Sequence, residues 1–136
     1  MRVMAFDIGL KRIGVAVTDP LQIIATSVGT YSPNDIAAYL NEYIKREPLE
    51  LFVLGKPLQM DGSNSESYHL VEQFSAWLQT TFPDIPQKWI DERLTSKMAS
   101  QALFDSGLKK KQRQDKKLLD AVSATLILQT YLLSKS

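Results

Sequence analysis

Cysteine is absent from this 136-residue chain, and histidine occurs only once, as His69. A chain without thiols has no disulfide, no cysteine nucleophile and no thiolate zinc site, which fits a reducing cytosol. The single histidine falls in a predicted helix, where we expect it on the helix surface rather than in a metal site. These absences leave carboxylates as the candidates for catalytic chemistry.

Long apolar segments are also missing. The longest late run without charge, Ala121–Leu133, has 13 residues, whereas a membrane-spanning helix needs about 20. Asp7 interrupts the apolar stretch after Arg2, so no signal peptide is expected. With 44% hydrophobic and 23% charged residues, the composition is that of a soluble globular protein, and we expect residues 1–136 to form one domain.

The net charge of +1 shows little excess of either sign, but the charges are unevenly distributed. Residues 1–108 carry nine basic and thirteen acidic residues, whereas residues 109–136 carry seven basic and two acidic ones. Such polarity places the basic charge near the C-terminal helix. The run from Lys109 to Lys117 is either a solvated linker or a surface that contacts phosphate.

Hydrophobic patterning predicts an α/β fold. Two apolar runs, Val3–Phe6 and Ile13–Val17, flank a short glycine-containing turn and predict a β-hairpin. Further strands are expected at 22–30, 49–54 and 86–90, and helices at about 32–47, 63–82, 95–107 and 115–133. This order predicts a mixed five-stranded sheet flanked by helices, with the first and fourth strands parallel neighbours.

Carboxylates follow two of the predicted strands and lie within the last helix. Asp7 ends the first strand, and Asp91 and Glu92 end the fifth, at the sheet edge where α/β proteins bind ligands. Asp120 lies among apolar residues of the last helix, where a carboxylate is costly unless it is paired or binds a metal. The alternatives are a solvated turn for Asp7 and an ion pair with Lys116 for Asp120.

Clustered carboxylates without cysteine form a hard-ligand set that suits Mg²⁺ or Mn²⁺ rather than Zn²⁺. Two such ions about 4 Å apart can activate water and stabilise the leaving oxygen in phosphodiester hydrolysis. The cations that could then hold a polyphosphate backbone are Lys11, Arg12, Arg93, Lys109, Lys110, Lys111 and Arg113.

Four segments of the chain, in order, resemble the YqgF family, also called RuvX, of pre-16S rRNA nucleases and Holliday junction resolvases. The segments are Asp7-x-Gly-x-Lys-Arg-Ile-Gly-Val-Ala-x-x-Asp19, Gly55-x-Pro-Leu-x-Met-Asp-Gly62, Asp91-Glu-Arg-Leu-Thr95, and Leu119-Asp120 leading to Ile127-Leu128-Gln129. Each motif alone is weak, but the four together extend over nearly the whole chain and are specific.

The resemblance implies an RNase H-like fold, a cytoplasmic location and maturation of the 5′ end of 16S rRNA. It also implies a metal-dependent acidic site at Asp7, Glu92 and Asp120. Many RNase H-like nucleases carry an acid on the fourth strand, whereas residues 51–55 of this chain contain none. Asp91 or Glu92 would have to substitute, and the sequence leaves that choice open.

The leading hypothesis is a metal-dependent endonuclease on structured RNA, in which Arg12, Arg93 and Lys56 steady phosphates. The same chemistry on branched DNA is the nearest alternative. A phosphotransfer fold of the actin and sugar-kinase kind opens with a similar Asp-x-Gly hairpin, but it normally needs two such domains. A non-catalytic RNA-binding assembly factor is the third alternative. The sequence leaves the oligomeric state, monomer or dimer, open.

Overall fold

The computed structural model describes residues 1–57, 67–91 and 116–135, excluding the side chains of residues 116–121 and 135. The elements in these ranges are β1 (Arg2–Ile8), β2 (Ile13–Thr18), β3 (Ala25–Tyr31), α1 (Ile36–Arg46), β4 (Leu49–Lys56), α2 (Tyr68–Thr81), β5 (Gln87–Asp91) and α5 (Lys116–Lys135). The predicted helix over residues 95–107 lies outside the described residues.

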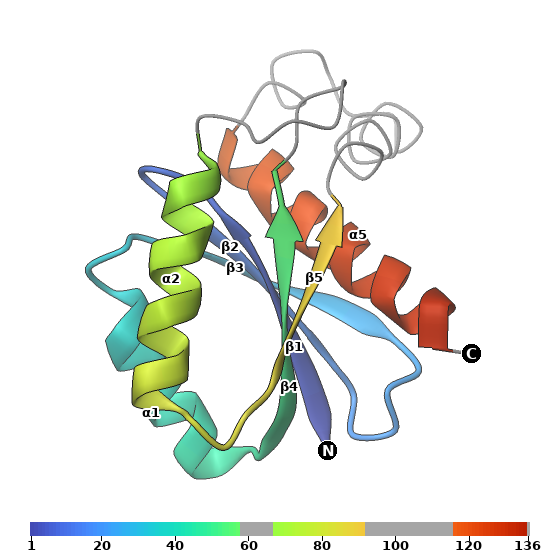
Figure 1. Ribbon diagram of the computed structural model, residues 1–136. Coiled ribbons are helices and arrows are strands. Elements are labelled where there is room, and N and C mark those ends of the chain that lie inside the picture. Colours follow the sequence, from blue (N-terminus) through green and yellow to red (C-terminus); the bar gives the residue numbers. More distant parts are fainter. Residues whose placement is uncertain (58–66, 92–115, 136) are drawn as a thin grey trace.

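The sheet has the strand order β3-β2-β1-β4-β5 (Figure 1). β1 pairs with β2 in antiparallel and with β4 in parallel orientation, β2 pairs with β3 in antiparallel orientation, and β4 pairs with β5 in parallel orientation. The mixed five-stranded sheet and the parallel pairing of the first and fourth strands are therefore confirmed. Three strands, β1, β4 and β5, point toward the same edge of the sheet.

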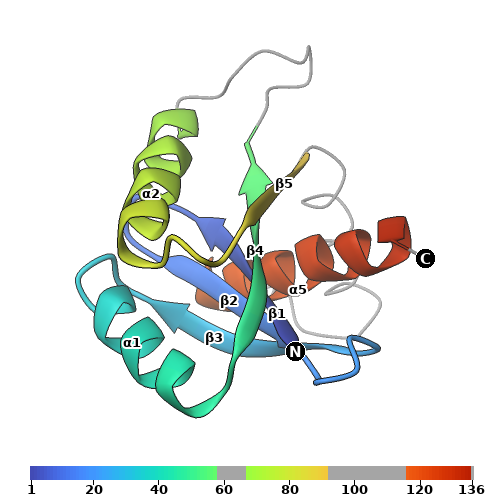
Figure 2. The same cartoon turned by 60° about the horizontal axis from the view of Figure 1, so that its bottom comes forward.

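Helices cover both faces of this sheet (Figures 1 and 2). α1 and α2 lie on one face, over a core of large side chains in which Phe6, Phe52 and Phe74 are in ring contact. α5 lies on the other face, over a smaller core that includes Ala5 and Ala16. We call these the α2 face and the α5 face, after the helix that each carries.

Alternation along β1 divides its residues between these two cores. Met4, Phe6 and Ile8 belong to the core of the α2 face. Val3 and Ala5 belong to the core of the α5 face. Because successive side chains of a strand point to opposite faces, every second residue of β1 shares a face.

The first helix begins later than the sequence signals indicated. Ser32 was expected to cap it, but residues 33–35 form a turn and α1 begins at Ile36. The Ser32 hydroxyl bonds the Asp35 carboxylate at 3.0 Å, and the Ser32 carbonyl accepts the amides of Asp35 and Ile36. A serine hydroxyl can satisfy a side chain instead of a helix amide, which is why the capping signal placed the start too early.

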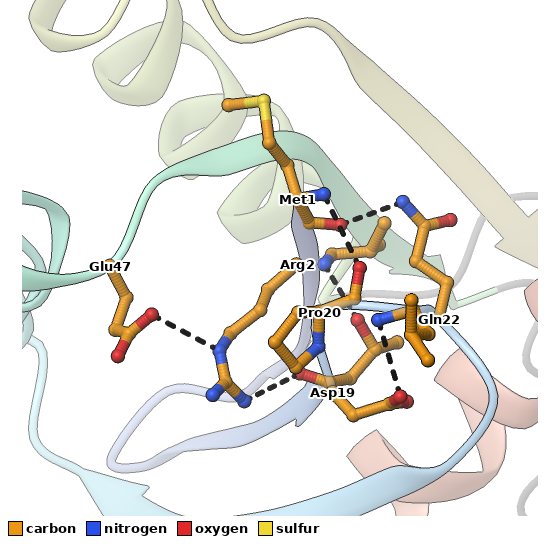
Figure 3. Close-up of polar contacts among 9 residues, drawn as sticks. Met1, Arg2, Asp19, Pro20, Gln22 and Glu47 are labelled. Carbon is orange, nitrogen blue, oxygen red and sulfur yellow. Dashed lines mark hydrogen bonds and ion pairs between the residues drawn. The ribbon is translucent and has the colours of Figure 1, made fainter.

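Polar contacts organise the opposite edge of the sheet, where β2 ends and β3 begins (Figure 3). The carboxylate of Asp19 accepts the backbone amides of Ile23 and Ile24 at 2.7 and 2.8 Å, and that of Leu21 at 3.2 Å. These hydrogen bonds from backbone amides lower the pKa of Asp19, and the one from Ile24 has the largest effect. Arg2 ties this edge to α1, since its guanidinium lies 3.4 Å from the Glu47 carboxylate. Asp19 is therefore an acid that closes its own loop.

Candidate functional site

Three of the predicted site residues lie at the C-terminal edge of the parallel strands. β1, β4 and β5 end at Ile8, Lys56 and Asp91 and run in the same direction. Asp7, Lys56 and Asp91 therefore lie at one edge of the sheet, as the sequence indicated. In open α/β sheets this edge is where ligands bind.

Asp7 lies on the α5 face of this edge. It follows Val3 and Ala5 at the spacing of two residues that keeps side chains on one face. Its cross-strand partner on β2 is Gly14, which has no side chain to cover the carboxylate. Asp7 is half-buried, so its carboxylate is partly desolvated but still open to solvent. A carboxylate in this position can bind a cation that approaches the rim of the sheet.

The turn after Asp7 carries two basic residues, Lys11 and Arg12. The amide of Gly9 donates to the carbonyl of Arg12 at 2.9 Å, which closes the turn between β1 and β2. A Cβ atom at position 9 would meet that same carbonyl oxygen at 3.0 Å, so the close turn favours glycine there. Lys11 is exposed and Arg12 is half-buried within this turn. The chain thus carries positive charge in the turn that follows Asp7.

Lys56 and Asp91 lie together on the opposite face. They are register partners on β4 and β5. Two residues before them, Leu54 and Trp89 are partners that belong to or pack against the core of the α2 face. Lys56 extends over the Tyr68 ring, with its ammonium 5.9 Å from the ring centroid. Strand alternation therefore separates Lys56 and Asp91 from the face on which Asp7 lies.

α5 begins near the same edge and runs away from it (Figure 1). Its C-terminal part, at Gln129 and Leu132, lines a cavity with Ile24 and Ala25 at the start of β3, on the far edge of the sheet. Residue 120 lies in the second turn of α5, four residues before Ala124, which packs against the sheet. Residues four apart in a helix share a face, so position 120 is in register with the packed stripe of α5.

Several predicted site residues lie outside the described ranges. These are Glu92, Arg93, Lys109, Lys110, Lys111, Arg113 and the side chain of Asp120. Within the described part of the chain, no three histidine, aspartate or glutamate side chains are grouped as a metal site would need. The resemblance implies Asp7, Glu92 and Asp120 as ligands, and the side chains of Glu92 and Asp120 are not described. The arrangement of these two with Asp7 therefore stays a prediction.

One feature, which extends from Trp89 toward the start of β5, was not anticipated from the sequence. An open groove of about 650 Å³ lies between α2 and β5 and is lined in part by Glu72, Gln79 and Trp89. Trp89 also packs against the core of the α2 face. The only sequence signal for the groove is the alternation of β5, which places Trp89 toward α2. No helix in the described ranges is long and apolar enough to cross a membrane.

The chain is similar to known proteins over nearly its whole length. The family model described as "RuvX: Holliday junction resolvase" matches residues 1–134. A protein of Parabacteroides distasonis named "Putative pre-16S rRNA nuclease" is 49% identical over 134 residues, covering 98% of this chain and 96% of the relative. A protein of Flavobacterium psychrophilum with the same name is 46% identical over 134 residues, covering 98% of each chain.

Solved structures show the same fold. RuvC of Thermus thermophilus in complex with a Holliday junction substrate superposes with a TM-score of 0.56 at 19% identity, covering 99% of this chain and 95% of RuvC. A second RuvC structure from T. thermophilus gives a TM-score of 0.53 at 15% identity, covering 99% and 97%. At this identity the likeness concerns the fold, and it confirms the expected RNase H-like architecture.

Proposed function

Because the chain belongs to the RuvX family, we propose that it is a metal-dependent endonuclease that processes the 5′ end of the 16S ribosomal RNA precursor. The observation that carries the proposal is the position of Asp7. Its half-buried carboxylate lies at the C-terminal edge of the sheet, opposite a glycine and beside the turn that holds Lys11 and Arg12. A carboxylate with adjacent cations suits a site that binds both a metal ion and a phosphate.

The proposed carboxylate set is Asp7, Glu92 and Asp120. Asp7 lies on the α5 face of the sheet, and position 120 is in register with the stripe of α5 that packs on that face. In β5, Ile90 packs in the core of the α5 face, and Lys88 lies over the ring of Tyr131 in α5. Continued alternation would give residue 92 the same face and residue 91 the other, which supports Glu92 over Asp91 as the ligand.

The donor chemistry of these residues fits Mg²⁺ or Mn²⁺. Carboxylate oxygens are the ligands that hard divalent ions prefer, and the cross-strand partner of Asp7, Gly14, has no side chain. A divalent ion bound there would supply charge stabilisation to the phosphodiester and lower the pKa of water. The role of Asp7 is to hold its carboxylate at the rim of the sheet, fixed by the β1–β2 pairing.

The cations around this edge would bind and orient the nucleic acid. Lys11 and Arg12, in the turn that follows Asp7, are placed to contact phosphates next to the scissile bond. Lys56 lies on the other side of the same edge, so it would contact a more distant phosphate. Arg93 and the basic residues Lys109, Lys110, Lys111 and Arg113 would extend this contact along the strand. Such contacts fix the register of the substrate without reading its sequence.

A branched DNA substrate is the second candidate. The name of the matching family model and the RuvC fold favour it. Both substrates contain a phosphodiester bond that would be cleaved, so one carboxylate site could serve either. We propose the RNA substrate because two relatives, 49% and 46% identical to this chain, are named "Putative pre-16S rRNA nuclease". That substrate would place the protein in the cytoplasm.

Cleavage of a 16S rRNA precursor leader by the purified protein in Mg²⁺ or Mn²⁺ tests the proposal, with a four-way DNA junction as the parallel substrate. Asp7→Asn and Glu92→Gln should each lower the cleavage rate at least about 100-fold, more than the loss of an outer-shell partner of a metal site typically causes. Asp91→Asn is the matched control, because it removes a carboxylate at the same edge but on the other face. It should keep most of the activity.

Activity that survives Asp7→Asn would reject the nuclease proposal for this site. RNA binding that persists in EDTA, with no cleavage under any metal condition, would favour a non-catalytic assembly factor instead. Cleavage of the junction but not of the leader would favour the DNA alternative.

A further inference from the structure

An aromatic and polar surface lies on the α2 face of the same edge, on the side of the sheet that does not carry Asp7. Tyr68, at the start of α2, and Trp89, on β5, have ring centroids 5.6 Å apart. Lys56 adds an ammonium 5.9 Å from the Tyr68 centroid. All three side chains are half-buried, so parts of them are open to solvent. The Tyr68 ring is thus a neighbour of both the Lys56 ammonium and the Trp89 ring.

Trp89 forms one wall of the groove between α2 and β5. The groove has a volume of about 650 Å³, and β5 is an outer strand of the sheet. Two of the groove's polar side chains, Ser75 and Gln87, hydrogen-bond each other, and the Gln87 amide also donates to the Ser75 carbonyl at 3.0 Å. These bonds hold β5 against α2, so the groove keeps its shape without a ligand.

The charges of the groove select the part of a nucleotide that could enter it. Glu72 and Gln79 are exposed on α2 and line the groove, and none of the described residues that line it is basic. A phosphate would be repelled by Glu72, whereas a base could stack on an indole and donate an exocyclic amine to a carboxylate. The phosphate would instead find the ammonium of Lys56, next to Tyr68.

We propose that this surface is a nucleotide subsite, in which an unpaired base stacks on Trp89 in the groove while its phosphate is held by Lys56. The inference rests on the proposed nuclease function and deepens it. It places part of a single strand on the α2 face while the scissile bond lies at Asp7 on the α5 face, so the substrate would cross the rim of the sheet. Bases with an exocyclic amine, which are adenine, cytosine and guanine, should be preferred over uracil because Glu72 can accept a hydrogen bond from them.

Tryptophan fluorescence in EDTA tests the subsite without any cleavage. The chain has two tryptophans, and in a Trp77→Phe background Trp89 is the only emitter. The probes are short single-stranded oligoadenylates made of RNA or of DNA. Their binding should quench the emission of Trp89, and the tighter of the two probes identifies whether an RNA or a DNA strand is the natural occupant. Emission that neither probe changes would overturn the proposal.

Substitutions give a second, independent measurement. By fluorescence anisotropy of a labelled oligoadenylate, Trp89→Leu should weaken binding about tenfold, the middle of the range for the loss of one base–aromatic stack. Trp89→Phe should restore most of the affinity. Trp77→Leu is the matched control, since Trp77 lines a different cavity, between α1 and α2, and it should bind as the unmodified chain does.

Glu72→Gln tests base selection and cannot plausibly unfold the protein, because Glu72 is exposed on a helix surface. It should reduce the preference for oligoadenylate over oligouridylate while the affinity for oligouridylate stays the same. Unchanged binding in both Trp89→Leu and Glu72→Gln would remove the subsite. Loss of cleavage in Asp7→Asn would still stand, so the two proposals fail separately.

Discussion

The two faces of the sheet differ in the size of the side chains that they bury. The α2 face holds large residues, among them Met4, Phe6 and Phe52, all fully buried. On the α5 face, Ala5 and its cross-strand partner Ala16 are fully buried and equally small. Large interlocking rings give the α2 face its stability, whereas small side chains let α5 approach the strands closely.

The close approach of α5 has a consequence for chemistry. A helix that packs tightly on a sheet near the end of a strand can place a carboxylate beside one that the strand carries. Asp7 is the residue of β1 that follows Val3 and Ala5 on this face, and Asp120 is the residue of α5 that precedes Ala124 by four. The comparison suggests that one face mainly stabilises the fold and the other face mainly positions the site.

Phe52→Ala should give the largest effect, on stability. Phe52 is fully buried and in ring contact with Phe6 and Phe82, and truncation of a core phenylalanine costs about 3–5 kcal/mol. Urea denaturation should show a free energy of unfolding lower by that amount. A loss below about 1 kcal/mol, the size of a typical surface or minor core change, would mean that the α2 face is not the main source of stability.

Ala5→Leu should give an intermediate effect, on both stability and activity. A larger side chain beneath α5 overpacks this core, which typically costs about 1–3 kcal/mol. It should also slow cleavage in protein that is still folded, because α5 carries Asp120. The measurement is the cleavage rate at a temperature well below the unfolding midpoint.

Met4→Leu is a control that introduces leucine on the other face of β1. Met4 is the neighbour of Ala5 on β1, but it lies on the α2 face. Methionine and leucine have nearly the same volume, so this exchange should leave the cleavage rate unaltered. If Ala5→Leu and Met4→Leu slowed cleavage equally, the distinction between the faces would be wrong.

Asp19→Asn should give the smallest effect, and one that depends on pH. Hydrogen bonds from the backbone amides of Ile24, Ile23 and Leu21 lower the pKa of Asp19 in the folded protein. A lowered pKa stabilises the fold above the pKa of the unfolded state, about 3.9, and this contribution disappears as the pH falls through the folded value. The unfolding temperature of Asp19→Asn should therefore lie below that of the unmodified chain at neutral pH and approach it in acid.

That comparison also separates two kinds of acid at the two ends of the sheet. Asp19 uses its carboxylate to close a loop, and Asn in its place should leave cleavage unchanged. Asp7 is proposed to act in chemistry, so Asn in its place should lower the cleavage rate at least about 100-fold at every pH. A cleavage defect in Asp19→Asn would show that the far edge also takes part in function.

Much of the fold could be predicted because its signals are local. The apolar runs at Val3–Phe6 and Ile13–Val17 fixed the hairpin, and the continuous apolar run at Leu51–Leu54 indicated a strand buried on both faces, which β4 is. The start of α1 was placed too early because a serine followed by proline looks like a cap, and only the structure shows that the Ser32 hydroxyl bonds Asp35. Capping depends on a competition between hydrogen bonds that the sequence does not resolve.

The site was harder to predict because faces depend on register. The sequence placed Asp7, Lys56 and Asp91 at one edge, but it could not say which face each occupies. The strand register supplies that information for two of them. Lys56 pairs with Asp91, two residues after the pair of Leu54 and Trp89, and so lies on the same face as that pair. The register also places Asp91 on the α2 face, whereas Glu92 lies outside the described residues. The aromatic groove was missed for the same reason, since Trp89 and Tyr68 are far apart in the chain.

The most direct test of the account is diffraction from crystals of the protein soaked in Mn²⁺, with the anomalous signal used to locate the ion. The account predicts a peak on the α5 face at the C-terminal edge of the sheet, within coordination distance of carboxylate oxygens from Asp7, Glu92 and Asp120. An ion held by Asp91 on the α2 face, or the three carboxylates found on different sides of the molecule, would contradict it.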